Sequence, residues 1–245
     1  MATIDEYKVD AIVIASHDYK ESSKIIRVFT RKLGRISIFA RGAKRAKSSL
    51  HNVSSLFSCS SMVLVKKGNL YYIKEATIKN ANLALREDIK SIYSAQLCME
   101  LVDKTLLEGQ VNEDIYDMVE KFLECLPACK NKTRLLSMFL IKFISMLGYR
   151  PHISSCSICG KIEGQMGFSY QYGGLVCISH PISSISLEDV EREMLNWLLF
   201  SRFEAVDNPG LDLNDKKIFK VLIDFILDKT EIKGLRVLRA YKSFM

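Results

Sequence analysis

Short apolar runs separated by polar turns fill the first 80 residues of the chain. Within these runs Val, Ile, Phe and Tyr recur with the two-residue period of half-buried β-strands. The pattern predicts strands over 9–15, 24–30, 35–41, 60–66 and 70–76. Gly34 and the Gly68-Asn69 pair mark tight turns between neighbouring strands. Five short strands so close together predict a small closed or nearly closed barrel.

Beyond residue 80 the apolar positions recur with the 3.6-residue period of α-helices. This period predicts helices over 83–109, 112–126, 132–147, 186–203, 212–229 and 235–244. Asn131 or Thr133 would cap the third helix, and the Ser-Leu-Glu-Asp run at Ser186 offers capping chemistry for the fourth. We therefore predict a multi-domain α+β protein, with a barrel domain over 1–79 and a helical domain over 80–245.

Two short motifs interrupt the helical domain at about 150–182 and carry the chemistry of a metal site. CSIC and CISH are separated by 17 residues and supply Cys156, Cys159, Cys177 and His180. A two-residue spacing aims a pair of side chains at one point, and thiolates with an imidazole are ligands that Zn²⁺ prefers. Four protein ligands leave no position for water, so the motifs predict one structural zinc ion in each chain.

Two other interpretations of these cysteines stay open. They could be small buried hydrophobes that fall at this spacing by chance. A redox-active CxxC is less favoured, because no strand-then-helix pattern of thioredoxin type surrounds it. His180 is the weakest of the four ligands, since a cysteine is the more usual fourth partner. His152 is a rival, but it lies outside the paired spacing.

Positive charge is concentrated in the predicted barrel. The chain carries a net charge of +7, yet residues 1–79 hold fifteen Lys/Arg against six Asp/Glu, whereas the remaining residues hold 20 against 22. The loop ARGAKRAKSSLHNVSS between the third and fourth strands is basic and rich in hydroxyls, and we expect one helical turn in it. Such an asymmetry indicates a polyanionic partner, although a merely solvated lysine-rich face is the alternative.

The remaining features exclude several classes of protein. Hydrophobic content of 48% and charged content of 26% are typical of a soluble globular protein. Neither a signal or transit peptide nor a membrane span is expected. The seven cysteines are an odd number and several lie in helical patterns, which favours a reducing cytosol over a disulfide framework. No P-loop, GxGxxG, GxSxG, HExxH or DxDxDG motif is present, so we expect no enzyme and no catalytic residues.

A basic barrel with surface aromatic residues can bind single-stranded nucleic acid. Its lysines and arginines neutralise phosphates, and its exposed rings stack on nucleobases. The candidate stacking residues are Tyr19, Phe39, Tyr71 and Tyr72. An aromatic residue in a strand is, however, more often part of the core. An RNA-binding or translation-associated protein with a zinc staple is the alternative function, and an enzyme acting on nucleic acid is a third class.

The run DYKESSKIIRVFTRKLGRISIFARGAKRAKSSL closely resembles the N-terminal signature of the RecO family of bacterial recombination and repair mediators. The shared pattern is an aromatic residue followed by Glu21, Ser22, Thr30, Gly34, Ala40, Gly42 and Ser48, with bases between them. LGYRPHISSCSICGK and YGGLVCISH look like the zinc knuckles of that family. One departure is His180, which stands where many zinc-bearing members have a fourth cysteine.

The resemblance implies an OB-fold barrel, a helical domain and no catalytic turnover. It also implies binding of single- and double-stranded DNA, annealing of complementary strands and, with RecR, loading of RecA onto single strands coated by the single-strand-binding protein SSB. The acidic C-terminal tail of SSB is an expected partner, while RecF, and RecA indirectly, stay open as further ones. Membranes are not expected as partners, and the expected location is the cytoplasm, at the nucleoid when bound to DNA.

On the matching positions of this chain, the resemblance implies DNA contacts at Lys24, Arg27, Arg31, Arg35, Arg41, Lys44, Arg45 and Lys47. The SSB tail is expected on the helical domain. There, Lys132, Arg134 and Lys142 are only weakly supported candidates.

Overall fold

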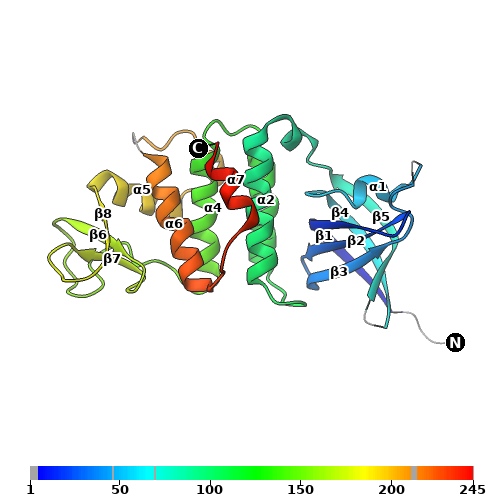
Figure 1. Ribbon diagram of the computed structural model, residues 1–245, viewed down its shortest axis with the longest axis horizontal. Helices are drawn as coiled ribbons and strands as arrows, with labels where there is room; N and C mark the ends of the chain where they lie inside the picture. Colours follow the sequence, from blue (N-terminus) through cyan, green and yellow to red (C-terminus); the bar gives the residue numbers. More distant parts are fainter. Residues whose placement is uncertain (1–4, 46, 69, 211–213, 245) are drawn as a thin grey trace. The chain divides into compact units, whose positions relative to one another are not determined.

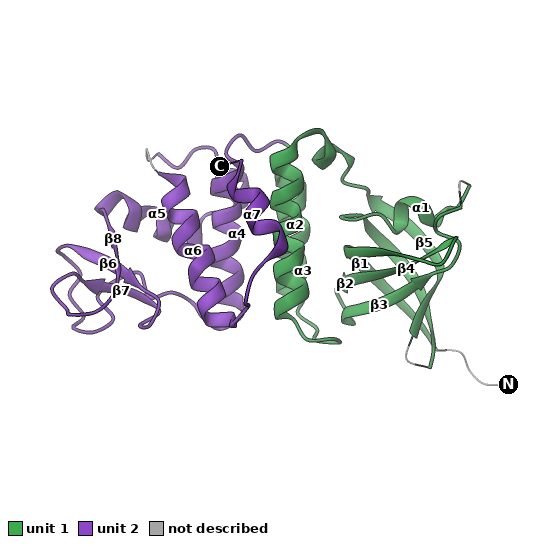
Figure 2. Cartoon of the chain, in the orientation of Figure 1, with its two compact units in different colours: residues 1–127 green, residues 128–245 purple. Residues whose placement is uncertain are grey.

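A computed structural model describes residues 5–45, 47–68, 70–210 and 214–244 of the chain. The chain divides into two compact units, unit 1 (Met1–Pro127) and unit 2 (Ala128–Met245), shown in Figure 2. Unit 1 extends beyond the predicted end of the barrel domain at residue 79, because two further helices group with the barrel. The predicted turn residue Asn69, and residues 212 and 213 of a predicted helix, lie outside the described residues.

Five strands close into a barrel in unit 1, in the order β1-β2-β3-β5-β4 (Figure 1). They are β1 (Glu6–Tyr19), β2 (Ser23–Thr30), β3 (Gly34–Ala40), β4 (Cys59–Lys67) and β5 (Leu70–Asn80). Every neighbouring pair is antiparallel except β3 and β5, which run parallel. The connection between β3 and β4 contains one short helix, α1 (Leu50–Val53). The predicted closed barrel is confirmed, and a five-stranded barrel of this kind has the architecture of an OB-fold.

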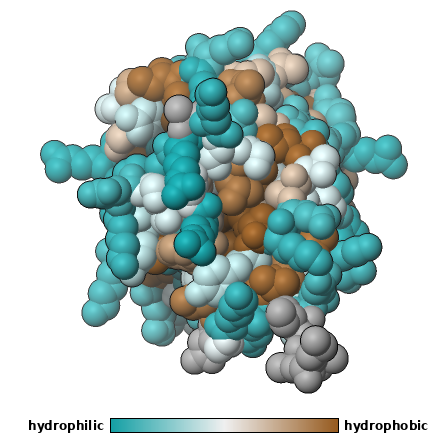
Figure 3. All heavy atoms as spheres, turned by 90° about the vertical axis from the view of Figure 1, so that its right-hand side faces the viewer, coloured by the Kyte–Doolittle hydropathy of each residue, from teal (hydrophilic) through white to brown (hydrophobic). Residues whose placement is uncertain are grey.

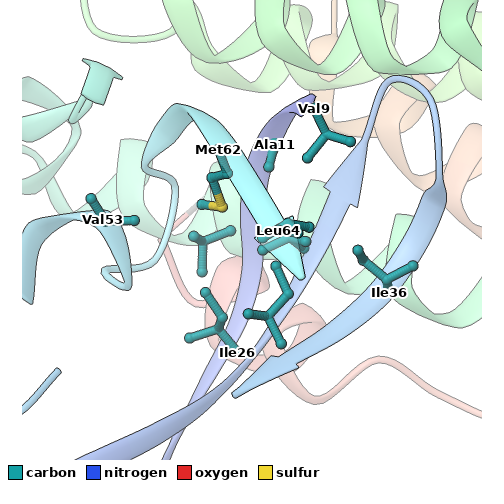
Figure 4. Packing of buried hydrophobic residues seen from close by; sticks show 10 residues of the cluster. Val9, Ala11, Ile26, Ile36, Val53, Met62 and Leu64 are labelled. Atoms are coloured by element: carbon teal, nitrogen blue, oxygen red, sulfur yellow. The ribbon is translucent and has the colours of Figure 1, made fainter. Parts of the chain in front are cut away.

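Alternate residues of the strands fill the barrel (Figure 4). The core residues are Val9, Ala11 and Val13 of β1, Ile26 and Val28 of β2, Ile36 and Ile38 of β3, and Met62 and Leu64 of β4, with Val53 of α1. Because successive side chains in a strand point to opposite faces, the two-residue period of the sequence becomes the inside of the barrel. This is why the pattern was sufficient to predict the strands.

Strand β5 changes phase half-way along its length. Leu64 lies opposite Ile73 while Val63 lies opposite Glu75, so Lys74 is an extra residue with no partner position on β4. Before this bulge the odd-numbered Tyr71 and Ile73 pack against the barrel core, and after it the even-numbered Ala76 and Ile78 do so. A bulge of one residue exchanges the two faces of a strand, which the alternation alone does not reveal.

Two helices of unit 1 follow the barrel, α2 (Ile89–Thr105) and α3 (Glu113–Cys125). The prediction of one helix over 83–109 is wrong, because a 3₁₀ turn (Leu83–Glu87) precedes α2 and the backbone is extended at Asp88. The Asp88 carboxylate accepts hydrogen bonds from the backbone N–H groups of Lys90 and Ser91. It therefore caps a new helix, which a periodicity of apolar residues cannot show.

The outer face of β2 and β3 is partly covered by these two helices. Phe29 is fully buried, and its ring lies 5.8 Å from that of Tyr116 on α3. Asp103 on α2 accepts from two arginines, with Arg27 Nη2 at 2.9 Å and Arg35 Nη1 at 3.2 Å. Asp103 is only 13% exposed, so both ion pairs lie in a largely desolvated position.

Unit 2 is built around helix α4 (Lys132–Met146), whose residues from Leu135 to Ile141 are all buried. Packed with it are α5 (Asp189–Phe200) and α6 (Asp215–Thr230), followed by α7 (Arg236–Lys242). The Asn131 side chain accepts a hydrogen bond from Arg134 N, which identifies Asn131 as the cap of α4. None of the described helices combines the length and the apolar character that a membrane span requires.

A small sheet that the sequence did not predict lies within unit 2. Its strands are β6 (Met166–Ser169), β7 (Gly174–Cys177) and β8 (Ile185–Leu187), in the order β7-β6-β8. Ser186 belongs to β8, so the prediction that a helix begins there is wrong. Instead, Glu188 and Glu191 form a reciprocal capping box at the start of α5. Strands of three or four residues are too short to show a period.

We predict that Asp103→Asn lowers the free energy of unfolding by about 2 kcal/mol, between the values for exposed and for buried ion pairs. The substitution keeps the size of the side chain but leaves Arg27 and Arg35 without a counter-charge. Urea denaturation measures the change. Asp114→Asn, at an exposed position of α3, is the matched control and should change stability by less than about 0.5 kcal/mol. Equal stabilities of the two variants would contradict the prediction.

Candidate metal centre and nucleic-acid interface

The structure brings Cys156, Cys159, Cys177 and His180 together in unit 2. Their ligand atoms all lie within 4.8 Å of one another, and the sulfur atoms of Cys159 and Cys177 are 3.6 Å apart. Ligands of a tetrahedral zinc ion with Zn–S bonds of about 2.3 Å are separated by about 3.8 Å. The four residues predicted as ligands could therefore hold a metal ion of this size.

Local backbone geometry places the first pair of cysteines. Gly160 N donates to Cys156 O at 2.9 Å, and Gly160 has a φ of +74°, which a residue with a Cβ rarely adopts. Strand β7 then delivers Cys177, whose backbone N–H donates to Cys156 Sγ at 3.3 Å. The knuckle and the strand thus converge on one point because of hydrogen bonds that do not involve a metal.

The electrostatics of the thiols are consistent with a cation at this point. Burial opposes ionisation of Cys156, but backbone N–H groups of Cys159, Ile158 and Cys177 outweigh it and lower the pKa of Cys156 to about 5. Burial and the two neighbouring thiols raise the pKa of Cys177 to about 11. Ionisation of all three thiols in such close contact would require a positive charge among them, which a divalent metal ion could supply.

The histidine also fits the cluster. His180 Nε2 is buried, and no described residue forms a hydrogen bond with it. A buried ring nitrogen without a partner is costly, and coordination to a metal would satisfy it. The rival His152 is not part of the cluster. Its Nε2 lies 2.8 Å from Ser155 Oγ, and its backbone bonds with Gly173 and Leu175.

The metal cluster is attached to the helices through aromatic packing. Phe168 of β6 contacts Phe225 of α6 with ring centroids 5.2 Å apart, and Tyr170 lies against the same ring. Both phenylalanines are fully buried. The sheet that carries Cys177 is therefore packed directly against the helical core of unit 2.

Three of the predicted DNA-contacting arginines have carboxylate partners within unit 1. Arg27 and Arg35 pair with Asp103, and Arg35 Nε also donates to Leu106 O at 3.0 Å. Arg31 pairs with Asp117 and Glu113 of α3, and its guanidinium lies over the ring of Tyr116. The charges of these three arginines are therefore paired with carboxylates of the same unit. The sequence could not show these ion pairs, because the acidic residues follow about 70 to 90 residues later.

The other five predicted bases lie at one end of the barrel. Lys44 N donates to Ser22 O, and Lys44 Nζ forms an exposed ion pair of 2.7 Å with Asp18, so the basic loop is held against the turn between β1 and β2. Lys24, the second residue of β2, lies opposite Asp18 and Ala40. Arg41, Arg45 and Lys47 are exposed, and no ion pair of theirs occurs among the described residues.

A row of aromatic side chains crosses the outer surface of the barrel beside this loop. Tyr19 of β1 contacts Phe39 of β3 at 5.6 Å between ring centroids, and Phe39 contacts Tyr72 of β5 at 5.6 Å. Lys20 Nζ lies 5.5 Å from the centroid of the Tyr19 ring, and Lys67 Nζ lies 5.9 Å from that of Tyr72. We call Tyr19, Phe39 and Tyr72 the aromatic row.

The three rings of the row are only partly exposed. Figure 3 shows the face at the barrel end of the molecule, where hydrophobic side chains lie near the centre and hydrophilic ones around them. Tyr19 is 39% exposed, and Phe39 and Tyr72 are half-buried. The sequence predicts these three rings as stacking candidates but does not single out Lys20 and Lys67 as contacts. Lys20 lies in the turn after β1 and Lys67 ends β4, and each adjoins a turn beside an aromatic strand.

The weakly supported SSB-tail candidates have partners inside unit 2. Arg134 pairs with Asp215 through Nε at 2.8 Å and Nη2 at 3.0 Å. Lys142 Nζ donates to Leu199 O at 2.7 Å, and burial lowers the pKa of this lysine. Lys132 Nζ donates to Cys129 O at 2.8 Å. The contacts of Arg134 and Lys142 join α4 to α6 and α5, whereas the contact of Lys132 is local to the start of α4.

Family models match almost the whole chain. The model described as Recombination protein O N terminal matches residues 1–82, and the one described as Recombination protein O C terminal matches residues 86–235. The chain belongs to the RecO family. The resemblance that the sequence motifs indicated is thus confirmed, and the barrel falls in the N-terminal match while the metal cluster falls in the C-terminal one.

Curated RecO relatives match most of the length of the chain. A DNA repair protein RecO of Alkaliphilus metalliredigens (strain QYMF) is 30% identical over 239 residues, which are 94% of this chain and 97% of the relative. Another from Caldanaerobacter subterraneus subsp. tengcongensis is 30% identical over 211 residues, covering 83% and 85%. A third from Bacillus cereus (strain AH187) is 32% identical over 225 residues, covering 91% of each.

We predict that His180→Ala lowers the metal content of the purified protein and its melting temperature, because metal binding is coupled to folding. The matched control is His152→Ala, which removes the other imidazole of the same module but no atom of the cluster. Elemental analysis and thermal denaturation measure both effects. Wild-type metal content in His180→Ala, or an equal loss in His152→Ala, would contradict the assignment of the fourth ligand.

Proposed function

We propose that this RecO-family chain is a DNA repair and recombination mediator that binds single- and double-stranded DNA and anneals complementary strands. With RecR, it helps to load RecA onto single strands coated by SSB, whose acidic C-terminal tail is a further partner. The proposed place of action is the cytoplasm. The observation that carries the DNA-binding part is the aromatic row beside an exposed basic loop.

The row and the loop supply the two interactions that a sequence-neutral single-strand site needs. Lys20, Lys67 and the bases of the loop can neutralise phosphates and release their counterions. The rings of Tyr19, Phe39 and Tyr72 can each stack on a nucleobase, and every base has a face for this contact. Hydrogen-bond recognition of particular bases is not required, which suits a protein that acts on DNA of any sequence.

Annealing follows from the same electrostatics. Two DNA strands repel each other through their phosphates, and a basic protein surface lowers this repulsion. The nucleobases of the bound strand stay exposed, or stack reversibly on the aromatic row, so that they can pair with a second strand. Arg27, Arg31 and Arg35 have no part in this proposal as direct contacts, since their carboxylate partners fix them between the barrel and its two helices. Their contribution is to hold the barrel in shape.

The metal cluster has a structural part in the proposal. Zinc is the ion that best suits three thiolates and one imidazole, and Cys156, Cys159, Cys177 and His180 would hold it with no position left for water. When bound, the ion supplies positive charge and cross-links the knuckles, and it supplies no catalytic step. The protein would act through binding energy, without catalytic turnover.

An RNA-binding function is the alternative, because an OB barrel suits RNA equally well. Competition between single-stranded DNA and RNA of the same sequence, combined with an annealing assay with and without SSB, separates the two. We expect DNA to compete at least as well as RNA and annealing to proceed on SSB-coated strands. If RNA competes better than DNA and no annealing occurs, the RNA-binding function replaces the proposal.

We predict that the change of Arg41, Lys44, Arg45 and Lys47 to Ala weakens single-strand binding about tenfold or more. Each lost phosphate contact should make the slope of log affinity against log salt less steep by about 0.7. The matched control changes four exposed bases of unit 2, Lys216, Lys220, Lys233 and Lys242, to Ala. Fluorescence anisotropy across a salt series measures both, and a flat salt response in the wild type would contradict the basic interface.

We predict that Phe39→Leu and Tyr72→Leu each weaken binding by about 1–3 kcal/mol, the value of one stacked base. Leucine keeps the apolar contacts of the barrel surface but has no ring. Tyr172→Leu, at an exposed tyrosine of the metal module, is the control and should leave affinity unchanged. If all three variants bind as the wild type does, the aromatic row is part of the fold and not of the interface.

A further inference from the structure

The hairpin formed by β4 and β5 carries two lysine–aromatic contacts, one on each face. Lys66 lies directly opposite Tyr71, with its Nζ 5.3 Å from the centroid of the Tyr71 ring. Lys67 makes the corresponding contact with Tyr72. Successive residues of a strand point to opposite faces, so the first contact cannot belong to the aromatic row. Tyr71 instead contacts Tyr7 and packs against the barrel core.

The Lys66–Tyr71 contact borders a cavity at the mouth of the barrel. The cavity has a volume of about 560 Å³, within the range of small-molecule and nucleotide sites. Leu33, Ile36 and Val111 supply apolar walls, and Lys32 in the turn between β2 and β3 lies on the rim. The cavity lies entirely within unit 1, since Glu108, Gly109 and Val111 precede α3.

The charges of this cavity favour an anion. Lys32 and Lys66 are both exposed, and neither forms an ion pair within the described ranges of the chain. The single acidic residue of the lining is Glu108, so two lysines face one carboxylate. An aromatic ring, apolar walls and an excess of ammonium groups together match a nucleotide, which has a flat base and a charged phosphate.

We propose that this cavity is a second nucleotide subsite, in which a base stacks on Tyr71 while Lys32 and Lys66 contact the neighbouring phosphates. Stacking of a base on an aromatic ring is stronger than an exposed contact between an ammonium group and a ring. A base can therefore replace Lys66 on the Tyr71 ring, and the freed ammonium group turns to the phosphate. The proposal rests on the proposed function, because it extends the binding of single strands beyond the aromatic row.

The position of the subsite implies that the β4–β5 hairpin directs the path of the bound DNA strand. Lys67 and Tyr72 belong to the outer surface, and Lys66 and Tyr71 belong to the mouth of the barrel, although the two pairs are adjacent in sequence. A strand that leaves the aromatic row can pass over the hairpin and place a further nucleotide in the cavity. The two faces would then hold consecutive parts of one strand.

The test uses the full chain and a fluorescent oligothymidylate of about 30 nucleotides, measured by anisotropy over a salt series. The variants are the double change Lys32→Ala with Lys66→Ala, and Tyr71→Leu. We expect the double variant to bind about tenfold or more weakly, with a salt slope less steep by about 1.4 for two lost phosphate contacts. Tyr71→Leu should weaken binding about fivefold or more, and Tyr71→Phe, which keeps the ring, should bind as the wild type does.

A second measurement identifies the contact directly. An oligonucleotide that contains 5-iododeoxyuridine should cross-link to the peptide that carries Tyr71 on irradiation, as mapped by mass spectrometry. The double change Lys216→Ala with Lys220→Ala removes the same charge from exposed positions of α6 and is the matched control. Its affinity and its cross-links should be those of the wild type.

The outcomes separate this subsite from the proposed function. If Tyr72→Leu weakens binding while the Lys32/Lys66 variant equals its matched control, the subsite is rejected and the proposed function stands. If neither variant affects binding, both the aromatic row and the cavity lie outside the interface, so the subsite is rejected together with the aromatic part of the proposed function. If the Lys32/Lys66 variant keeps its DNA affinity but loses binding of an acidic peptide, the cavity is a peptide site and the proposal is overturned.

Discussion

The two ion pairs of Asp103 determine which part of the barrel surface is covered by helix α2. One carboxylate, almost withdrawn from water, accepts from Arg27 and Arg35 on adjacent strands. Such a group is costly to bury unless its charge is matched, so the two arginines and the helix are held together. The two ion pairs attach α2 to the part of the β2–β3 surface that carries Arg27 and Arg35. The aromatic row lies on β1, β3 and β5, and none of its three residues has an ion pair or ring contact with α2 or α3 among the described residues.

This division explains why charge counting alone was an incomplete guide to the interface. Ten bases between residues 20 and 50 indicated a polyanion-binding surface, yet three arginines in that stretch face acids on α2 and α3. The acids are distant in sequence, and no local pattern connects them with the strands. In the loop from Arg41 to Lys47, Lys44 has one exposed ion pair with Asp18, and Arg41, Arg45 and Lys47 form none with the residues that the structure describes. Tertiary contact therefore decides which part of a uniform charge pattern faces solvent.

The metal centre shows the opposite case, in which local sequence contained nearly all of the information. A two-residue spacing fixes the direction of two ligands within one knuckle, and Gly160 permits the turn. Sequence analysis could therefore name all four residues of the cluster. It could not name β6, β7 and β8, because strands of three or four residues follow from pairing with each other and from the contact of Phe168 with Phe225. The barrel strands were predictable because each is long enough to repeat its period against a common core.

The extra residue Lys74 in β5 has a consequence for how this chain can vary. The bulge sets the phase of the strand, so that Tyr71 turns into the barrel and Tyr72 turns outward. Deletion of one residue there would exchange the two tyrosines without changing either of them, because a shift of one position inverts every side chain that precedes it. Insertions and deletions in this strand must therefore change its length by an even number of residues, because an odd change moves the side chains to the opposite face. Descendants of this sequence should tolerate substitutions in β5 far more readily than a change of a single residue in its length.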